Sequence, residues 1–335
     1  MAAVPPVRSS ETDDVGAIQP QLALRQRQIE NRGFMGHIIE VEIVDRDGVG
    51  VIRGIGETRG RAIVPVACVG LSLLLVVMVV ANHRSLSREL ELWRRFESLG
   101  RNRFGLREYR HRATGIVFIY LPGGDTWLGS PQSESERADG EELRRVRLSP
   151  FLLAKYETTR AEWGVVMGES ASVEEHRDLP VTDVNWNDCA AFCSAAGFAL
   201  PSDAQWEYAC RAGSSGQFAF GETLDESCAN VSGTSRSARW EPPLPAQSLV
   251  PNRFGFHHLH GNVREWCEDA WDVGFASSED ARGPDPVCRG GMPFRVIRGG
   301  SWVDPPSYCR SAFRSGYHER LSLPYIGFRP AFRLR

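Results

Sequence analysis

Histidines gather at one point in the second half of the chain, where they could hold a metal ion. His257, His258 and His260 fall within four residues, and imidazole is a common ligand of zinc and non-haem iron. Their spacing is not that of one helix face, and no carboxylate–histidine motif accompanies them. We therefore expect satisfied or exposed histidines here and no zinc or iron centre.

Cysteines are the second group of reactive side chains. Seven lie in the C-terminal two-thirds of the chain, at Cys189, Cys193, Cys210, Cys228, Cys267, Cys288 and Cys309, and Cys68 lies in an apolar segment. Seven is an odd number, so at least one thiol stays free. Cys189 and Cys193 are four residues apart on an expected helix, which suits neither a disulfide nor a CxxC metal motif. The number of cysteines fits an oxidising compartment.

The overall composition is that of a folded protein without affinity for nucleic acid. The 335 residues include 39 Lys+Arg and 42 Asp+Glu, so the net charge is −3. A near-neutral chain lacks the electrostatic attraction that nucleic-acid binding needs. Nine tryptophans and 33 glycines favour a fold rich in loops, in which large aromatic side chains anchor irregular backbone.

Twenty residues without a charge, 62–81, predict a membrane-spanning helix. Such a helix would be about 30 Å long, which matches the hydrocarbon core of a bilayer. The flanking arginines are nearly balanced, so charge alone does not orient the span. We expect a single-pass membrane protein, with a transmembrane helix at 62–82 in the lipid bilayer and the large C-terminal domain outside the cytoplasm.

Three further segments complete the expected organisation. Residues 1–61 form a polar, partly disordered N-terminal region, in which the alternation over 37–51 and the Asp47-Gly48 pair predict a hairpin. Residues 83–111 form a juxtamembrane helix, over 85–99, and a linker. Residues 112–335 form the large domain.

The elements of the large domain predict an α+β fold with much irregular structure. Short strands are expected at 115–128 and 146–155. Capping boxes begin two helices, at Thr159 and Ser202, a small-residue helix is expected over 185–197, and glycines end all three. Beyond 214, regular periodicity disappears.

Five blocks of this domain resemble the sulfatase-modifying factor family, typified by the formylglycine-generating enzyme. They read LPVTDVNWNDCAAFC, LPSDAQWEYACRAG, GFHHLHGNVREWCEDAW, RVIRGGSW and GFRPAFRLR, and they occur in the family's order over about 112–335. The resemblance implies a variant of the C-type lectin fold. It implies no single activity, because the same domain serves several roles. Cys193 and Cys210 match positions that form disulfides in some relatives, but the expected partners are Pro330 and Arg314.

The resemblance places a catalytic site after Gly299-Gly300. Active relatives use two cysteines there to hold copper(I), which with oxygen converts a substrate cysteine to formylglycine. Cys309 falls on the second of these positions, whereas Asp304 occupies the first. A carboxylate is a hard ligand and cannot complete a bis-thiolate site. Ser301 would join these two as a catalytic candidate, and Trp302 and Arg310 would bind substrate.

The resemblance also implies calcium loops. By position, the ligands of one are the carbonyls of Gly261 and Val263 and the carboxylate of Glu265. Calcium takes six to eight oxygen ligands, but His258 stands where a side-chain oxygen is expected. Glu265 would otherwise form a buried hydrogen-bonded link that organises the loop. Asn230 resembles the start of a second loop, without its expected aspartate.

Two functions are compatible with these residues. The first is a membrane-anchored formylglycine-generating-enzyme-like protein without that activity, which binds a protein or peptide ligand. The alternative is a metal-dependent oxidoreductase that acts on a protein or small-molecule thiol through Cys309, with copper or iron. Asp304, at the position of the first family cysteine, favours the function without formylglycine-generating activity.

Overall fold

The computed structural model describes two parts of the chain. Strands are described within 22–52, and the C-terminal part is described over 91–168, 176–233, 243–290 and 293–334. The two parts belong to separate compact units, Met1–Val79 and Val80–Arg335. The predicted membrane span, 62–82, lies outside the described residues. Within the described ranges, no helix is both long and apolar enough to cross a bilayer.

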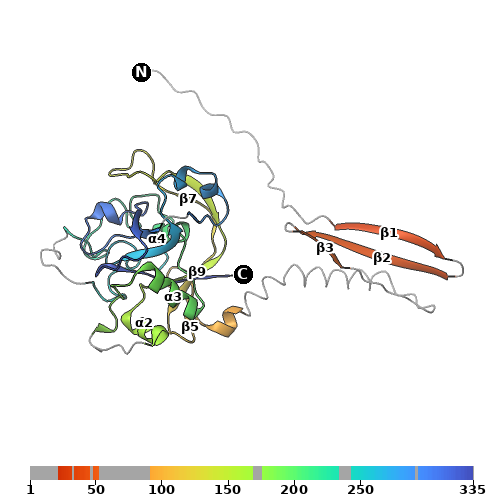
Figure 1. The fold of residues 1–335 in the computed structure, drawn as a ribbon, viewed down its shortest axis with the longest axis horizontal. Coiled ribbons are helices and arrows are strands. Elements are labelled where there is room, and N and C mark those ends of the chain that lie inside the picture. The colour runs from red at the N-terminus through yellow and green to blue at the C-terminus, as the bar shows by residue number, and fades with distance from the viewer. Residues whose placement is uncertain are drawn as a thin grey trace, which may run out of the picture. The chain divides into compact units, whose positions relative to one another are not determined.

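The N-terminal unit contains a three-stranded antiparallel sheet (Figure 1). Its strands are β1 (Leu22–Asn31), β2 (Phe34–Asp45) and β3 (Gly48–Ile52). β2 and β3 pair with Asp45 opposite Gly48, so the predicted hairpin is confirmed. β1 was not predicted, because its centre reads Arg-Gln-Arg-Gln and lacks the apolar alternation that identifies a strand.

The C-terminal unit is built around a five-stranded sheet of order β14-β9-β6-β5-β4. The strands are β4 (Phe96–Arg101), β5 (Arg107–His111), β6 (Val117–Leu121), β9 (Phe151–Ala154) and β14 (Ala331–Arg333). The first and last segments of the domain therefore meet in one sheet.

This sheet corrects the expected boundary of the domain. Residues 91–95 are helical, but the juxtamembrane helix predicted over 85–99 ends before Phe96, and the expected linker forms β4 and β5. The reason is the side chain of Phe96, which is buried against Phe118 and Phe332. The helical spacing of Leu86, Leu90, Trp93 and Phe96 in the sequence could not reveal this core contact.

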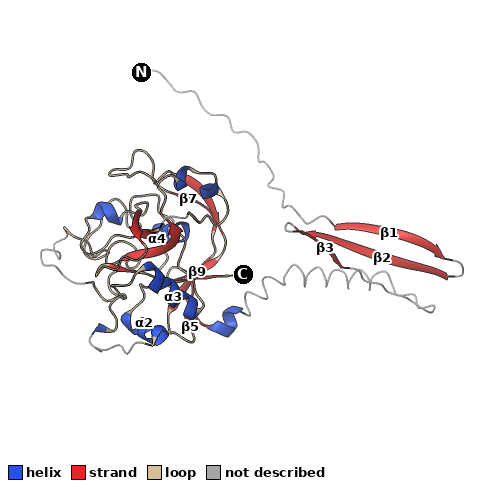
Figure 2. Ribbon diagram, viewed as in Figure 1, coloured by secondary structure: helices blue, strands red, loops and turns tan. Residues whose placement is uncertain are grey.

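Alternate residues of the sheet enter two different cores. Phe118 and Leu152 face one core together with α2 (Arg160–Met167) and α3 (Trp186–Ala196). Ile119 and Leu153 face the second core with α4 (Asp203–Arg211). Figures 1 and 2 show α2 and α3 on one side of β9 and α4 on the other. A sheet covered on both faces needs apolar residues at successive positions.

The three helices begin at the expected residues, and Asn185 caps α3 as Thr159 and Ser202 cap α2 and α4. Thr159, Asn185 and Ser202 each accept a hydrogen bond from a backbone N–H of the first turn, and a capping box closes each helix start. Gly168 and Gly197 end α2 and α3 in the left-handed region. α4 ends one residue earlier than expected, at Ala212.

A second sheet has the order β12-β11-β10-β13, with Glu265 in β10 and with Ser301, Asp304 and Cys309 in the connection between β11 and β12. Its strands are β10 (Arg264–Ala270), β11 (Phe294–Arg298), β12 (Ser315–His318) and β13 (Ile326–Gly327). The remaining strands, β7 (Gly124–Leu128) and β8 (Arg144–Leu148), form a separate pair. The strand expected over 146–155 is thus divided into β8 and β9 at Ser149-Pro150.

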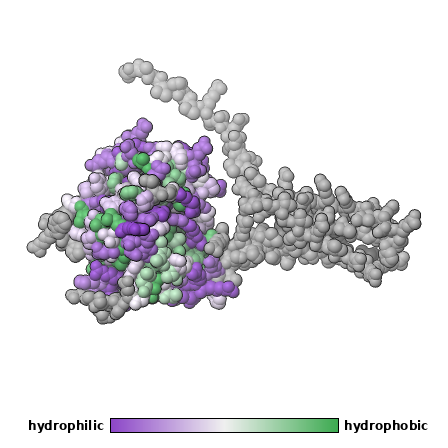
Figure 3. All heavy atoms as spheres, viewed as in Figure 1, coloured by the Kyte–Doolittle hydropathy of each residue, from purple (hydrophilic) through white to green (hydrophobic). Residues whose placement is uncertain are grey.

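The surface in Figure 3 is mostly hydrophilic, with apolar side chains in scattered areas.

Candidate functional site

Asp304, at the position of the first family cysteine, is held in a buried ion pair. Arg264, the first residue of β10, donates from Nε to Oδ2 (2.8 Å) and from Nη2 to Oδ1 (2.5 Å). Ser301 Oγ donates to Oδ2 at 2.6 Å. Both carboxylate oxygens are therefore engaged by donors of the protein itself, with the guanidinium in bidentate geometry.

Cys309 lies at the end of a short 3-10 helix, Pro306–Cys309, and its side chain is buried. Its exposed fraction is 0%, and its Sγ approaches the carbonyl of Pro305 at 3.7 Å. Burial, with a further contribution from the charge of Asp304, raises the pKa of this thiol. A protonated, enclosed thiol is a poor nucleophile and a poor metal ligand.

These side chains do not fit the copper(I) site of active relatives. That site needs two thiolates and an open position for a substrate thiolate. The present pair supplies one buried thiol and one carboxylate that is already neutralised by Arg264. In the described part of the chain, no group of three or more His, Cys, Asp or Glu side chains is arranged to hold a metal ion.

Glu265, the expected calcium ligand, is paired with an arginine. Arg329 donates from Nε and Nη2 to its two oxygens, each at 2.7 Å, and Trp206 Nε1 donates to Oε2 at 2.7 Å. All three side chains are fully buried. The guanidinium thus supplies the positive charge that a calcium ion would bring to this carboxylate.

The other proposed calcium ligands lie around a second buried carboxylate. Asn230 and Gly261 form a parallel bridge, and the N–H of Val263 donates to Glu157 Oε1 at 3.1 Å. Asn262 Nδ2 donates to Glu157 Oε2 at 2.6 Å. Burial, reinforced by the charge of Glu265, raises the pKa of Glu157 well above its usual range. Backbone and amide donors thus hold this loop together.

The three histidine side chains form hydrogen bonds within the protein. His260 Nδ1 bonds the carbonyl of Cys309 (2.7 Å), and Nε2 accepts the N–H of Ala219 (3.0 Å). This pairing requires the neutral tautomer protonated on Nδ1, and burial lowers the pKa of His260 to about 4. His258 Nε2 contacts Ser248 Oγ at 3.1 Å, and burial lowers its pKa to about 3. His257 Nδ1 contacts the Ser248 carbonyl at 3.0 Å.

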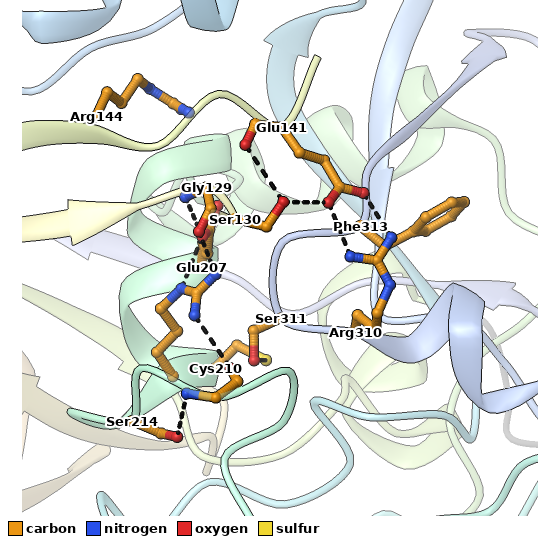
Figure 4. A network of polar contacts seen from close by, with 12 residues as sticks. Gly129, Ser130, Glu141, Arg144, Glu207, Cys210, Ser214, Arg310, Ser311 and Phe313 are labelled. Carbon is orange, nitrogen blue, oxygen red and sulfur yellow. Dashed lines mark hydrogen bonds and ion pairs between the residues drawn. The ribbon is translucent and has the colours of Figure 1, made fainter. Parts of the chain in front are cut away.

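Arg310, a candidate for substrate binding, anchors a loop instead. Its Nη atoms bind both oxygens of Glu141 at 2.8 Å (Figure 4). Nη1 also binds Glu134 at 2.7 Å. The carbonyls of Glu136 and Ser307 accept the remaining donors. A guanidinium has five N–H groups, and all five are used here. Arg310 has no donor left for a ligand.

The cysteines form no disulfide among the described residues, where all seven are free and buried. The absence of bridges at Cys193 and Cys210 agrees with the loss of their partner cysteines. The expectation of an oxidising compartment therefore has no disulfide to support it.

Aromatic side chains border the surface above the Asp304–Arg264 pair. Tyr308 is 44% exposed, and its ring stacks on Phe313 with centroids 4.8 Å apart. The Arg264 guanidinium lies 5.9 Å from the ring centre of Tyr308 and 5.4 Å from that of Tyr317. Trp302, a predicted ligand contact, is half-buried. This arrangement offers flat aromatic faces but no reactive group.

Two residues of the site were not found from the sequence. Arg264 and Arg329 lie 40 and 64 residues from their carboxylate partners, so no local spacing connects them. One signal was available for Arg264. An aspartate that replaces a buried cysteine needs a counter-charge, and Arg264 lies inside a conspicuous block of the sequence.

Comparison with known proteins identifies the domain. Residues 103–334 match the sulfatase-modifying factor enzyme 1-like domain. The chain is 27% identical to the formylglycine-generating enzyme of Thermomonospora curvata over 295 residues, which cover 65% of this chain and 93% of that enzyme. It is 31% identical over 153 residues to the inactive C-alpha-formylglycine-generating enzyme 2 of Mus musculus, over 43% of this chain and 46% of that protein.

A solved structure shares the fold. PvdO from Pseudomonas aeruginosa superposes with a TM-score of 0.59 and 24% identity, over 71% of this chain and 98% of PvdO. The chain therefore belongs to the sulfatase-modifying factor family, and the predicted family and mixed α+β fold are confirmed.

Proposed function

We propose that this chain is a membrane-anchored member of the family that does not generate formylglycine and instead binds a protein or peptide ligand. The observation that carries the proposal is the buried Asp304–Arg264 ion pair, with Ser301 as a further donor. It replaces one thiolate of the oxidation site with a neutralised carboxylate. The similarity to an inactive relative supports the same view.

A peptide assay tests the absence of activity. The full chain is incubated with copper, oxygen and a sulfatase-type CxPxR peptide, and the peptide mass is measured. We expect the peptide mass to remain unchanged. The Thermomonospora curvata enzyme is the active control and should convert the same peptide. Conversion of the cysteine to formylglycine, with loss of two hydrogens and replacement of sulfur by oxygen, would refute the proposal and favour the oxidase alternative with Cys309.

The ligand surface is proposed to include Tyr308 and Trp302. Tyrosine and tryptophan supply large contact areas at small entropic cost. Binding of a peptide array to the full chain is compared with binding of Tyr308→Ala, with Phe104→Ala, another exposed aromatic residue of the chain, as the matched variant. We expect only Tyr308→Ala to lose the signal; equal loss in both variants would place the ligand elsewhere.

The anchor and the orientation are separate proposals. The 20 uncharged residues at 62–81 support the anchor, and protease protection in sealed vesicles tests on which side the domain lies. We propose the extracytoplasmic side. Digestion of the domain by protease added to the cytoplasmic face would overturn that placement without affecting the anchor.

A further inference from the structure

Positive charge is concentrated where the domain begins. Residues 91–114 contain seven arginines, Arg94, Arg95, Arg101, Arg103, Arg107, Arg110 and Arg112, against three glutamates, although the whole chain carries a net charge of −3. Two of the glutamates are already paired, Glu97 with Arg110 at 3.5 Å and Glu108 with Lys155 at 2.9 Å. The segment is therefore a local excess of cations on an otherwise acidic chain.

An open cleft of about 520 Å³ lies in this region. Arg94, Arg95 and Arg112 line it, and no acidic residue does. Arg95 is held by the carbonyls of Ala196 and Gly197 at the end of α3, at 3.4 and 3.3 Å. In the described ranges Arg94 and Arg112 are exposed and have no acidic partner within ion-pair distance.

A buried histidine lies next to these arginines. His111 also lines the cleft, and burial, with a contribution from the charge of Arg95, lowers its pKa to about 4. The histidine therefore adds no charge of its own at neutral pH. The charged side chains that line the cleft are therefore all arginines.

Exposed apolar side chains border the same arginines. Trp93 is 71% exposed, and Val165, which lines the cleft from α2, is 61% exposed. Tryptophan next to basic residues is typical of the interface between a bilayer and water, where the indole lies at headgroup level and arginines meet phosphate.

We infer that the cleft and its arginines, Arg94 and Arg112 foremost, dock on anionic lipid headgroups. The inference rests on the proposed membrane anchor. Nine peptide units separate residue 82 from residue 91, and even a fully extended chain of that length spans only about 32 Å. The arginines are thus tethered within reach of the headgroups, and charge complementarity selects an anionic lipid surface as the occupant.

Hydrogen exchange of the full chain in nanodiscs tests the inference. Discs of phosphatidylcholine are compared with discs that contain 30% phosphatidylglycerol. We expect slower exchange of the amides at 94–112 on the anionic discs, and loss of the difference at high salt. The difference should also vanish in Arg94→Gln/Arg112→Gln and persist in Arg145→Gln/Arg289→Gln, a matched pair of exposed arginines elsewhere. Equal exchange on both discs would overturn the inference and leave the anchor intact.

Vesicle flotation separates the two proposals. A chain that floats with neutral vesicles supports the anchor, and one that does not refutes it. In the second case, flotation with anionic vesicles still tests the arginines. Removing Arg94 and Arg112 should weaken that binding roughly thirtyfold, about fivefold per arginine; an unchanged affinity would overturn the headgroup contact. Slower amide exchange at 94–112 in detergent that depends on protein concentration would indicate that a second copy of the chain covers the cleft. That result would also overturn the headgroup contact.

Discussion

Buried arginines hold the carboxylates of this domain. Arg329 and Arg310 are fully buried, and each uses all five N–H groups on carboxylate and carbonyl acceptors. A lysine could satisfy neither arrangement, because it presents one charged atom without a planar fork. At Glu265 and Asp304, an arginine thus binds the carboxylate oxygens that would otherwise be available to a metal ion.

Removal of the charge of Glu265 tests this role. Glu265→Gln leaves Arg329 buried without its counter-ion, which should lower the free energy of unfolding by about 3–5 kcal/mol. Urea denaturation in calcium and in chelator should give the same loss. Glu97→Gln is the matched control, because Glu97 is 53% exposed in its ion pair with Arg110 and should cost less than about 1 kcal/mol. If calcium stabilises the wild type and not the variant, Glu265 is a calcium ligand.

At the scale of elements, the turn after β11 determines the shape of the candidate site. Gly300 has φ +65° and lies against Cys309, so that a Cβ at this position would overlap Sγ and approach the Tyr308 carbonyl oxygen at 3.0 Å. The turn therefore closes over the thiol, which explains why Cys309 is enclosed. The amide of Trp302, just after this turn, is bound to the carbonyl of Asn262.

Gly300→Ala should destabilise the protein more than Gly168→Ala. Both glycines have a left-handed φ, but a Cβ on Gly168 would meet nothing within 4 Å. The backbone cost of about 1–2 kcal/mol is common to both, and overpacking adds about 1–3 kcal/mol at Gly300 only. Thermal unfolding measures the difference. In a Cys309→Ala background the extra cost of Gly300→Ala should fall; an unchanged cost would mean that sulfur is not the obstacle.

For the whole molecule, buried titratable groups connect stability to pH. Burial lowers the folded-state pKa of His260 from 6.5 to about 4. As the pH falls below 6.5, His260 binds a proton in the unfolded chain but not in the folded chain. The free energy of unfolding therefore decreases towards pH 4. Asp269 acts in the opposite direction, because burial and the charge of Asp203 raise its pKa from 3.8 to about 7.

Two variants should separate these effects in denaturation curves measured between pH 7 and 4.5. His260→Gln should lose less stability on acidification than the wild type, by up to about 1.4 kcal/mol per pH unit. Asp269→Asn should lose more, because it lacks the proton uptake on folding that Asp269 provides. Slopes that change in the same direction in both variants would contradict these assignments.

Local sequence determined the parts of this protein that depend on near neighbours. The capping boxes at Thr159 and Ser202, the glycine ends of α2 and α3, the β2–β3 hairpin and the family are all read from residues a few positions apart. Steric and hydrogen-bonding preferences act within one turn, so the sequence alone suffices there.

Only the tertiary structure decided what the singled-out residues do. Asp304 meets Arg264, Glu265 meets Arg329 and Arg310 meets Glu141 across 40, 64 and 169 residues. A buried charge requires a partner of opposite charge, but the sequence does not show which distant residue becomes that partner in the folded protein. For the same reason Phe96 belongs to a strand and not to the predicted helix: its place was determined by a core that its own neighbours do not form.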